Sequence, residues 1–334
     1  MQVIELESFG KLVKKERPTP KPGPGQVVVR MHAASLNYRD LLMTQGGYGS
    51  MAKPPFIPIS DGAGEIAEMG PGVTRVKVGD RVCPNFFQGW IAGAPRADHT
   101  GTPLGGPADG TLCQYMLLSE QGVSRIPDHL SWEEAASLPC AALTAWSAVV
   151  SQGSTVPGDT ILTQGSGGVS LFALQFAKAK GCRVIATSSS EDKLDRLRRM
   201  GADAVINYKA DANWGRTARG LAGPLGVDQV IEVGGAGTMV QSIKAVRFGG
   251  QISLIGVVAG ALGELNYALI VMNNIRLQGV TVDSRDNFEH MLAAIDVAKL
   301  KPPVDKVFGF DQVEEAMAYM QAGKHFGKVC IEIP

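Results

Sequence analysis

The sequence has few cysteines, and the way they are spaced argues against a disulfide-stabilised scaffold. Only five occur among 334 residues, an odd number, and no two of them form a C-x-x-C pair. They are dispersed along the chain at Cys83, Cys113, Cys140, Cys182 and Cys330. Isolated cysteines of this kind are typical of reduced thiols in a reducing compartment. We therefore expect a cytoplasmic protein without disulfide bonds.

The sequence also lacks net charge and long apolar runs. Lysine plus arginine and aspartate plus glutamate each number 32, so no net field attracts nucleic acid or an anionic membrane. No run of 18 apolar residues occurs, and the N-terminal MQVIELESFGK does not resemble a signal peptide. We expect about two domains, a small-molecule substrate, and neither a nucleic-acid nor a membrane partner.

The most informative stretch that is present is 160–193, which predicts a strand, a glycine turn, a helix and a second strand. A β-favouring run ends before the glycines, and apolar residues then recur at helical spacing until Gly181. The turn reads G-x-G-x-x-S, with Ser170 in the place of a third glycine. Such a turn brings backbone N–H groups to a pyrophosphate at a helix N-terminus. The cofactor-binding residues that we expect here are Gly165, Ser166, Gly167, Gly168 and Val169. The alternative is a tight strand-to-helix turn that binds nothing.

The end of the second strand predicts which nicotinamide cofactor is bound. NAD sites commonly place an acidic residue there to bind the ribose 2′-hydroxyl. This chain instead has hydroxyls at 187–190, followed by Lys193. Hydroxyls and an ammonium suit a 2′-phosphate, so Ser188, Ser189 and Lys193 favour NADP. The alternative is that Ser190 caps a helix and Lys193 is solvated.

Helices and strands continue to alternate after Lys193, as a doubly wound parallel sheet requires. Strands are expected at 204–207, 228–233, 251–255 and 277–282. Ligands bind at the carboxyl ends of such strands. We therefore expect four further residues in the cofactor groove: Val233, Gly234, Ile255 and Gly256.

The first part of the chain has a different, β-rich pattern. Strands and turns are expected in 1–33 and 62–82, and 33–49 reads as a strand end followed by a short helix. Polar residues at this junction, namely Asn37, Tyr38, Arg39 and Asp40, are candidate substrate-facing groups. The alternative is a capped helix start with a solvated charge pair.

At this point the sequence resembles a known family. AASLNYRDLL, SDGAGEIAEMGPGVTRVKVGDRV, LPCAALTAWSAVV, GDTILTQGSGGVSLFALQFAKAKG and HFGKVCIEI look like the medium-chain dehydrogenase/reductases, and most like their zinc-free quinone oxidoreductase-like and enoyl reductase-like branches. The resemblance covers essentially the whole chain. It implies an α/β fold with a GroES-like catalytic domain at 1–140, completed by 284–334. It also implies a Rossmann domain at 141–283, with the active site in the cleft between them.

The resemblance adds residues that the pattern alone does not single out. Thr144 matches a position against the nicotinamide ring, and Tyr208 matches a tyrosine near the 2′-phosphate. Lys328 matches a basic residue near the cofactor phosphates, and it could also pair with Asp61 or be a solvated lysine. The family's common habit further implies a homodimer.

The chain departs from the zinc alcohol dehydrogenases of the same superfamily at their metal ligands. Asn37, Ser60 and Cys140 stand where those relatives have Cys, His and Cys, and this set is poor for Zn²⁺. The four cysteines of their structural zinc lobe are missing from 85–112. We therefore expect no metal. An irregular site that uses Asp61, His99 or Cys140 is the alternative.

The same segment, 85–112, is long and rich in glycine and proline. Long loops of this kind are usually lids or binding loops, so Phe86, Phe87 and Trp90 are expected to line an apolar substrate pocket. Core packing of the three rings is the alternative.

These features together predict an NADPH-dependent, zinc-independent oxidoreductase that transfers hydride to a quinone, enone or related carbonyl acceptor. Without a metal, hydrogen-bond donors must stabilise charge on the substrate oxygen. We expect Asn37 to be that donor, Tyr38 or solvent to supply the proton, Arg39 to position substrate or cofactor, and Asp40 to orient these side chains. The alternatives are a zinc-type alcohol dehydrogenase with an irregular metal site and a non-catalytic NADPH-binding protein.

Overall fold

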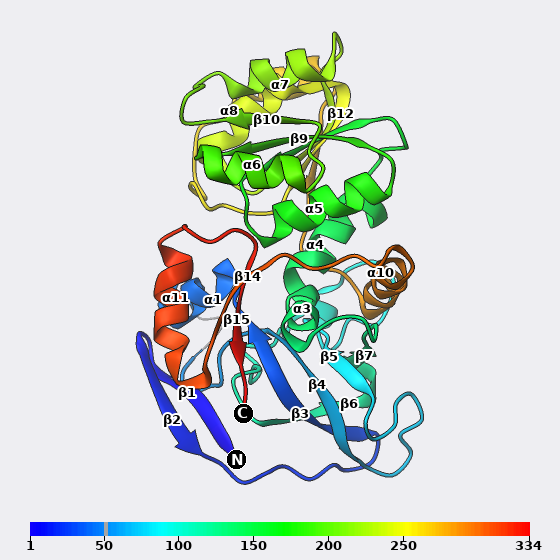
Figure 1. The fold of residues 1–334 in the computed structure, drawn as a ribbon, viewed down its shortest axis with the longest axis vertical. Coiled ribbons are helices and arrows are strands. Elements are labelled where there is room, and N and C mark those ends of the chain that lie inside the picture. The colour runs from blue at the N-terminus through cyan, green and yellow to red at the C-terminus, as the bar shows by residue number, and fades with distance from the viewer. Residues whose placement is uncertain (50–52) are drawn as a thin grey trace. The chain divides into compact units, whose positions relative to one another are not determined.

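The computed structural model describes residues 1–49 and 53–334. The chain divides into two compact units (Figure 1). The first unit contains 1–143 and 282–334, and the second contains 144–281. Among the described residues, no helix combines the length and the apolar character needed to cross a bilayer.

The first unit is built on a mainly antiparallel sheet. Its strands are β3 (Gln26–Ser35), β4 (Asp61–Met69), β5 (Arg81–Pro84), β6 (Tyr115–Ser119), β7 (Val123–Arg125), β14 (Val304–Phe308) and β15 (Lys328–Glu332). The valine-rich β3 is its centre and pairs with β4, β6 and β15. A separate hairpin contains β1 (Gln2–Ser8) and β2 (Lys11–Glu16).

The last strand brings the C-terminus beside the start of the sequence. In the antiparallel pairing of β15 with β3, Cys330 lies opposite Ser35 and Ile331 lies opposite Ala34. This register carries Lys328, the first residue of β15, past the end of β3 to the loop that opens the next helix. Residues almost 300 positions apart in sequence therefore meet in this unit.

Short helices complete the first unit. They are α1 (Tyr38–Thr44), α2 (Ala97–Thr100), α3 (Trp132–Ala136), α10 (Arg285–Ala298) and α11 (Val313–Gln321), with single turns η2 (Glu120–Gly122), η3 (Leu138–Ala142) and η5 (Phe310–Gln312). Ser131 caps α3, because its Oγ accepts the N–H of Glu134 at 3.2 Å. The core of the unit includes Val27, Val29, Met31, Ile66, Leu112 and Ile331.

The second unit is a doubly wound parallel sheet. Its strands are β8 (Thr160–Gln164), β9 (Arg183–Ser188), β10 (Ala204–Asn207), β11 (Val227–Glu232), β12 (Val246–Leu254) and β13 (Arg276–Gly279). They pair in the order β10-β9-β8-β11-β12-β13, and all neighbours are parallel. The order reverses between β8 and β11, and open sheets of this kind bind ligands at that switch point.

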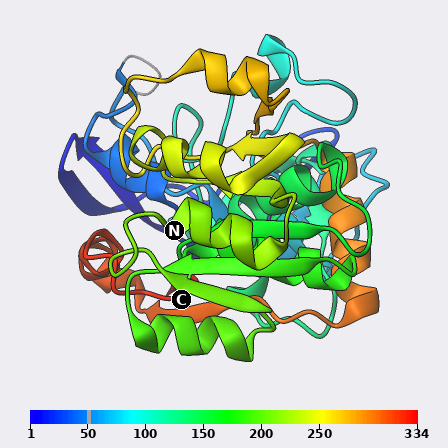
Figure 2. The ribbon, with the colours of Figure 1, turned by 90° about the horizontal axis from the view of Figure 1, so that it is seen from above.

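Helices cover both faces of this sheet (Figures 1 and 2). α5 (Gly168–Ala179) and α6 (Glu191–Arg199) lie on one face, and α7 (Trp214–Ala222) and α8 (Ala236–Ala245) lie on the other. The remaining helical segments are α4 (Leu143–Trp146), η4 (Ser147–Ser151) and α9 (Tyr267–Met272). The predicted fold class, a β-rich domain plus a doubly wound domain, is confirmed.

The segment 138–150 is irregular. It consists of the π turn η3, the short α4 and the second π turn η4. Pro139 lies in the first turn, where its missing N–H costs little. Apolar spacing predicts a helix but does not separate α from π hydrogen bonding, and π turns often occur at functional sites.

Candidate active site

The start of α1 positions the four predicted polar residues at 37–40. The backbone N–H of Asn37 donates to Asp40 Oδ2 at 2.8 Å, and the N–H of Asp40 donates to the carbonyl of Asn37 at 2.9 Å. Asp40 is only 1 % exposed, and burial raises the pKa of its carboxyl to about 6. Asp40 therefore fixes the turn that holds Asn37. Tyr38, by contrast, is exposed at the first position of α1.

Lys328 is buried against this turn. Its Nζ donates to Asn37 Oδ1 at 2.5 Å and to the carbonyl of Leu36 at 2.6 Å. At 3 % exposure it is not the solvated lysine of the alternative interpretation. Within the described part of the chain, the hydrogen-bond partners of Nζ are these two oxygens, so Asp61 is linked to the ammonium only through other groups.

The amide of Asn37 and the hydroxyl of Ser60 connect the ammonium of Lys328 to Asp61. Asn37 Nδ2 lies 3.4 Å from Ser60 Oγ, and Ser60 Oγ donates to Asp61 Oδ1 at 2.9 Å. The other carboxylate oxygen of Asp61 accepts the N–H of Cys140 at 3.0 Å. Burial raises the pKa of Asp61, while the charge of Lys328 and hydrogen bonds from Asn37 and Ser60 oppose that rise. We call Lys328, Asn37, Ser60, Asp61 and Cys140 the polar cluster.

Arg39 holds the long loop rather than pointing into solvent. Its guanidinium donates to the carbonyls of Leu104 at 3.0 Å and Gly106 at 3.2 Å. The same group lies 5.0 Å from the centre of the Phe86 ring and 5.9 Å from that of Tyr48. Arg39 thus connects α1 to the segment 85–112. Its contact with substrate or cofactor stays a prediction.

The three aromatic residues of that loop pack on one another. Phe86 and Phe87 meet edge to face with ring centres 4.6 Å apart, and Phe87 lies 6.0 Å from Trp90. Trp90 Nε1 donates to the carbonyl of Gly93 at 2.9 Å. All three are buried. The packing alternative explains these contacts without a substrate, and a role in substrate binding stays a prediction.

Tyr48 is a candidate that the sequence interpretation missed. It is half-buried, and burial raises the pKa of its hydroxyl, while the charge of Arg39 opposes that rise. The Tyr48 ring lies 5.9 Å from the Arg39 guanidinium, whereas the exposed Tyr38 was the predicted proton source. The local signal was weak, because Tyr48 follows two glycines and reads as part of a surface turn.

In the second unit, the glycine turn is open above its backbone. Gly165 has a φ of +75°, which only glycine adopts readily. A Cβ placed on Gly165 or Gly167 would meet no atom within 4 Å. No side chain caps the N-terminus of α5, which begins directly after Gly167. These features fit a pyrophosphate held by the free N–H groups of the helix start.

The ends of β9 and β10 lie beside this turn. The N–H of Gly165 donates to Thr187 Oγ1 at 3.3 Å, and the N–H of Tyr208 donates to the carbonyl of Ser188 at 3.1 Å. Ser189, Ser190 and Lys193 are half-buried at the start of α6. One carboxylate is also near: Glu191 accepts a hydrogen bond from Asn207 Nδ2 at 2.7 Å. The structure thus joins Ser188 to Tyr208, residues that were predicted separately.

A buried carboxylate that the sequence interpretation missed shapes the ends of β11 and β12. Glu232 is fully buried and accepts the N–H groups of Gly234 and Gly235 at 2.8 and 3.0 Å. Its own carbonyl accepts the N–H groups of Ile255 and Gly256 at 2.8 and 3.3 Å.

The predicted groove residues at these two strand ends are therefore brought together. Gln164 Oε1 adds acceptors for the N–H groups of Val233 and Gly234. Thr144 is buried in the same unit, and its contact with the nicotinamide stays a prediction. The sequence did contain one signal for Glu232: it is an acidic residue at the end of a strand.

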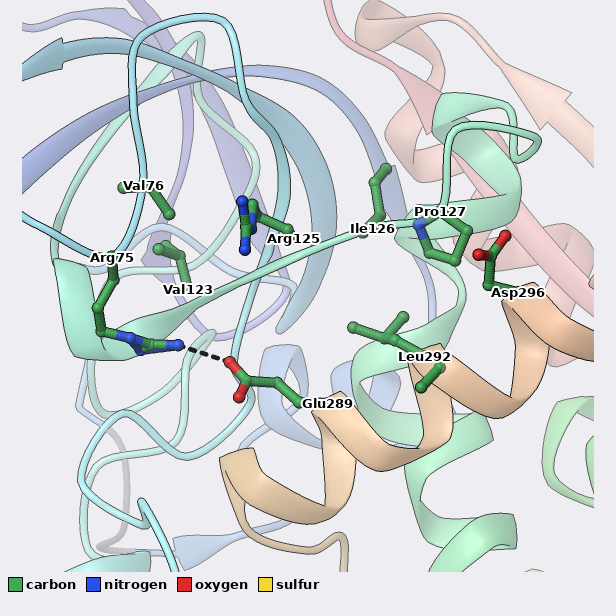
Figure 3. Close-up of a pocket in the computed structure, with 10 residues that line it drawn as sticks. Arg75, Val76, Val123, Arg125, Ile126, Pro127, Glu289, Leu292 and Asp296 are labelled. Carbon is green, nitrogen blue, oxygen red and sulfur yellow. Dashed lines mark hydrogen bonds and ion pairs between the residues drawn. The ribbon is translucent and has the colours of Figure 1, made fainter.

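A pocket of about 510 Å³ lies elsewhere in the first unit, between β7 and α10 (Figure 3). Arg75 points toward Glu289 across it, and the two form an ion pair at 2.5 Å. Val123, Ile126 and Leu292 give it an apolar wall. No residue of the polar cluster lines it. The pocket therefore adds nothing to the candidate active site.

The polar cluster does not fit a zinc ion. Asn37 Oδ1 already accepts from a cation, and the Ser60 hydroxyl donates to Asp61. Burial raises the pKa of the Cys140 thiol, which disfavours the thiolate that zinc requires. Over 1–49 and 53–334, no group of three or more His, Cys, Asp and Glu side chains is arranged to hold a metal. The position of the ammonium is the main obstacle, because two cations would repel each other there.

Comparison with known proteins identifies the class. Residues 23–128 match the alcohol dehydrogenase GroES-like domain, and residues 168–297 match the zinc-binding dehydrogenase domain. A zinc-type alcohol dehydrogenase-like protein of Schizosaccharomyces pombe is 41% identical over 98% of this chain and 97% of its own. A quinone oxidoreductase-like protein of Bos taurus is 26% identical over 95% of this chain and 88% of its own.

Two solved structures share the whole fold. An NAD-dependent alcohol dehydrogenase has a TM-score of 0.93 at 33% identity, and a mycobacterial protein in complex with NADPH has a TM-score of 0.83 at 25% identity. Each covers 100% of both chains. The chain belongs to the medium-chain dehydrogenase/reductase superfamily, as the sequence resemblance predicted, and it is an oxidoreductase of that family.

Proposed function

We propose that this oxidoreductase reduces a quinone, enone or related carbonyl compound with NADPH and without a metal. The observation that carries the proposal is the contact between Lys328 Nζ and Asn37 Oδ1. It puts the amino group of Lys328 against a residue that stands where zinc-dependent relatives have a metal ligand. An acceptor whose negative charge is delocalised, such as an enone or quinone, suits a site that relies on hydrogen-bond donors.

The choice of NADPH is supported by the end of β9. The strand ends at Ser188 with hydroxyls on both sides, and Tyr208 lies next to it through a backbone hydrogen bond. No aspartate or glutamate ends this strand, and a 2′-phosphate avoids a carboxylate. The first carboxylate after the strand is that of Glu191, and it accepts a hydrogen bond from Asn207 Nδ2 at 2.7 Å. A preference for NADH over NADPH in turnover would contradict this choice.

The nicotinamide cofactor, when bound, supplies the hydride. The side chains of this chain supply orientation and charge. Asn37 donates an N–H to the substrate oxygen, Asp40 fixes the turn that carries Asn37, and Arg39 holds the loop 85–112 against α1. The half-buried hydroxyl of Tyr48 is the proposed proton donor, since a phenol carries its proton at neutral pH and this ring lies 5.9 Å from the Arg39 guanidinium.

The test is NADPH consumption over a panel of quinones, enones and aldehydes, with and without a chelator. The proposal predicts turnover with enones or quinones that the chelator leaves unchanged, and a preference for NADPH over NADH. Activity with simple alcohols or aldehydes that disappears with the chelator would support a zinc-type alcohol dehydrogenase instead. Tight NADPH binding without oxidation by any acceptor would support a non-catalytic binding protein.

We also propose that the protein forms a homodimer through β13. This strand lies at one end of the six-stranded sheet, so one of its edges has no neighbour among the described strands. The segment that precedes β13 in the chain, α9 and the loop before it, has exposed apolar side chains at Val258, Leu262, Val271 and Met272. Light scattering should give twice the chain mass, and Val271→Glu should shift it toward the monomer. A wild-type monomer would contradict this proposal.

A further inference from the structure

Lys328 determines which way the amide of Asn37 faces. An ammonium has three N–H donors and no acceptor, so the Asn37 atom that contacts it must be the carbonyl oxygen. The 2.5 Å contact from Nζ therefore fixes Oδ1 on one side and the amide nitrogen on the other, 3.4 Å from Ser60 Oγ. Water in place of the ammonium would leave both amide orientations open.

The direction set by Lys328 continues through the polar cluster. An ionised carboxylate only accepts hydrogen bonds, so Ser60 must donate to Asp61, at 2.9 Å, and accept from Asn37. The backbone N–H of Cys140 occupies the second oxygen of Asp61 at 3.0 Å. A donor-only group at one end and an acceptor-only group at the other thus leave a single arrangement of hydrogens between them.

The cation also makes Asn37 a stronger donor. A positive charge on the carbonyl oxygen draws electron density from the nitrogen of the conjugated amide, and hydrogen-bond chains strengthen in this way in buried sites. The distance of 3.4 Å from Nδ2 to Ser60 Oγ is long for a hydrogen bond. Ser60 therefore holds the amide nitrogen of Asn37 only weakly. Hydrogen bonds of catalytic groups tighten when the substrate binds.

We propose that Lys328 is a positioning residue for the reduction, which acts through Asn37. Its ammonium orients and polarises the amide so that an N–H bond donates to the substrate oxygen as negative charge develops there. The inference rests on the proposed function, because that function places the substrate oxygen beside Asn37. A metal-dependent relative polarises the oxygen directly with its ion; this chain uses a fixed cation and an intervening amide.

The kinetic test compares Lys328→Met with Asn37→Ala. Met retains most of the apolar length of lysine and lacks the charge. Each variant should lower kcat for enone reduction about 100-fold, the usual effect of removing one such donor, while KM for the enone changes little. The double variant should be no slower than either single variant, because both remove the same donor. If the fold-decreases in kcat of the two single variants multiply in the double variant, the inference is wrong.

A matched control is Lys324→Met, an exposed lysine on the same C-terminal segment. It should leave kcat unchanged. Rescue by a small amine separates charge from packing: methylammonium should restore part of kcat to Lys328→Ala, and none to Lys328→Ala combined with Asn37→Ala. Absence of rescue in a folded Lys328→Ala protein would contradict the inference.

A binding measurement keeps the inference separate from the reaction itself. 4-Nitrophenolate carries a delocalised oxyanion, and its absorbance reports binding to the protein saturated with NADP without any turnover. Lys328→Met and Asn37→Ala should each weaken its binding about tenfold. If this occurs while wild type reduces no acceptor, the proposed reaction fails and the role of Lys328 stands. If wild type reduces enones and Lys328→Met changes neither kcat nor nitrophenolate binding, the role of Lys328 fails alone.

Discussion

The two candidate binding regions of this chain are built in opposite ways. In the second unit, the turn at Gly165 and Gly167 has open space above its backbone and a helix start that no side chain caps. In the first unit, buried side chains balance one another, with Lys328 at one end of the polar cluster and Asp61 at the other. The glycine turn depends on the absence of side chains that would fill the space above it. The polar cluster depends on opposite charges that balance each other. They should therefore fail under different substitutions.

The largest effect should follow the loss of one buried charge. Lys328→Met leaves Asp61 without a cation, which should lower the free energy of unfolding by about 3–5 kcal/mol. Adding Asp61→Asn should restore most of that loss, because both charges are then gone. Urea unfolding of the three variants measures this directly. A double variant as unstable as the sum of the singles would show that the two charges do not balance each other.

The next effect is a pH dependence that the glycine turn cannot have. Burial raises the pKa of Asp40 from its ordinary value of 3.8 to about 6, so the folded state holds this proton more tightly than the unfolded state. The associated stability is present below about pH 4 and is lost as pH rises through about 6, roughly 3 kcal/mol in all.

Asp40→Asn keeps an acceptor for the Asn37 N–H and cannot ionise. Relative to this variant, wild type should lose stability between pH 4 and 7, as followed by the urea midpoint at each pH. Asp61, whose pKa burial also raises, contributes a slope of the same sign that both proteins share. Parallel curves for wild type and Asp40→Asn would contradict the assignment.

A negative charge in the glycine turn should act on binding and not on folding. Gly167 has a φ of −78° and open space around its Cβ position, so any residue fits. Gly167→Asp should raise the Kd for NADPH about 100-fold through repulsion of the pyrophosphate, and Gly167→Asn should raise it much less. Fluorescence titration gives both values, and the melting temperature should stay near that of wild type. Equal effects of Asp and Asn would point to steric exclusion instead of charge.

The smallest expected effect concerns the choice of cofactor. Ser189 is half-buried just after β9, and Ser189→Asp should weaken NADPH binding about tenfold while NADH binding stays constant or improves. Ser189→Asn is the uncharged control and should change the ratio little. If Ser189→Asp leaves the NADPH to NADH ratio unchanged, the 2′-phosphate lies elsewhere.

The same contrast explains how much the sequence could predict. The glycine turn is local, because strand, turn and helix follow one another within 160–179, and periodicity with glycine placement is enough to recognise it. The order of alternating helices and strands likewise indicated the doubly wound sheet. Element ends were less certain: β13 ends at Gly279, before the predicted Val282.

The contacts within the polar cluster could not be predicted from local sequence patterns. Lys328 and Asn37 are 291 positions apart, and only the pairing of β15 with β3 brings them together. Burial, which makes their contact important, is a property of the folded chain. Tyr48 was missed for the same reason, since it looks ordinary in its local sequence, and the one local signal for Glu232 was its place at the end of a strand.

The central claim is that the first unit supplies its own cation in place of a metal. Its most direct test is the zinc content of the protein purified without chelator, measured by mass spectrometry alongside NADPH-dependent enone reduction. The account predicts full activity with far less than one zinc ion per chain. One tightly held zinc ion per chain, lost together with activity on chelation, would contradict it.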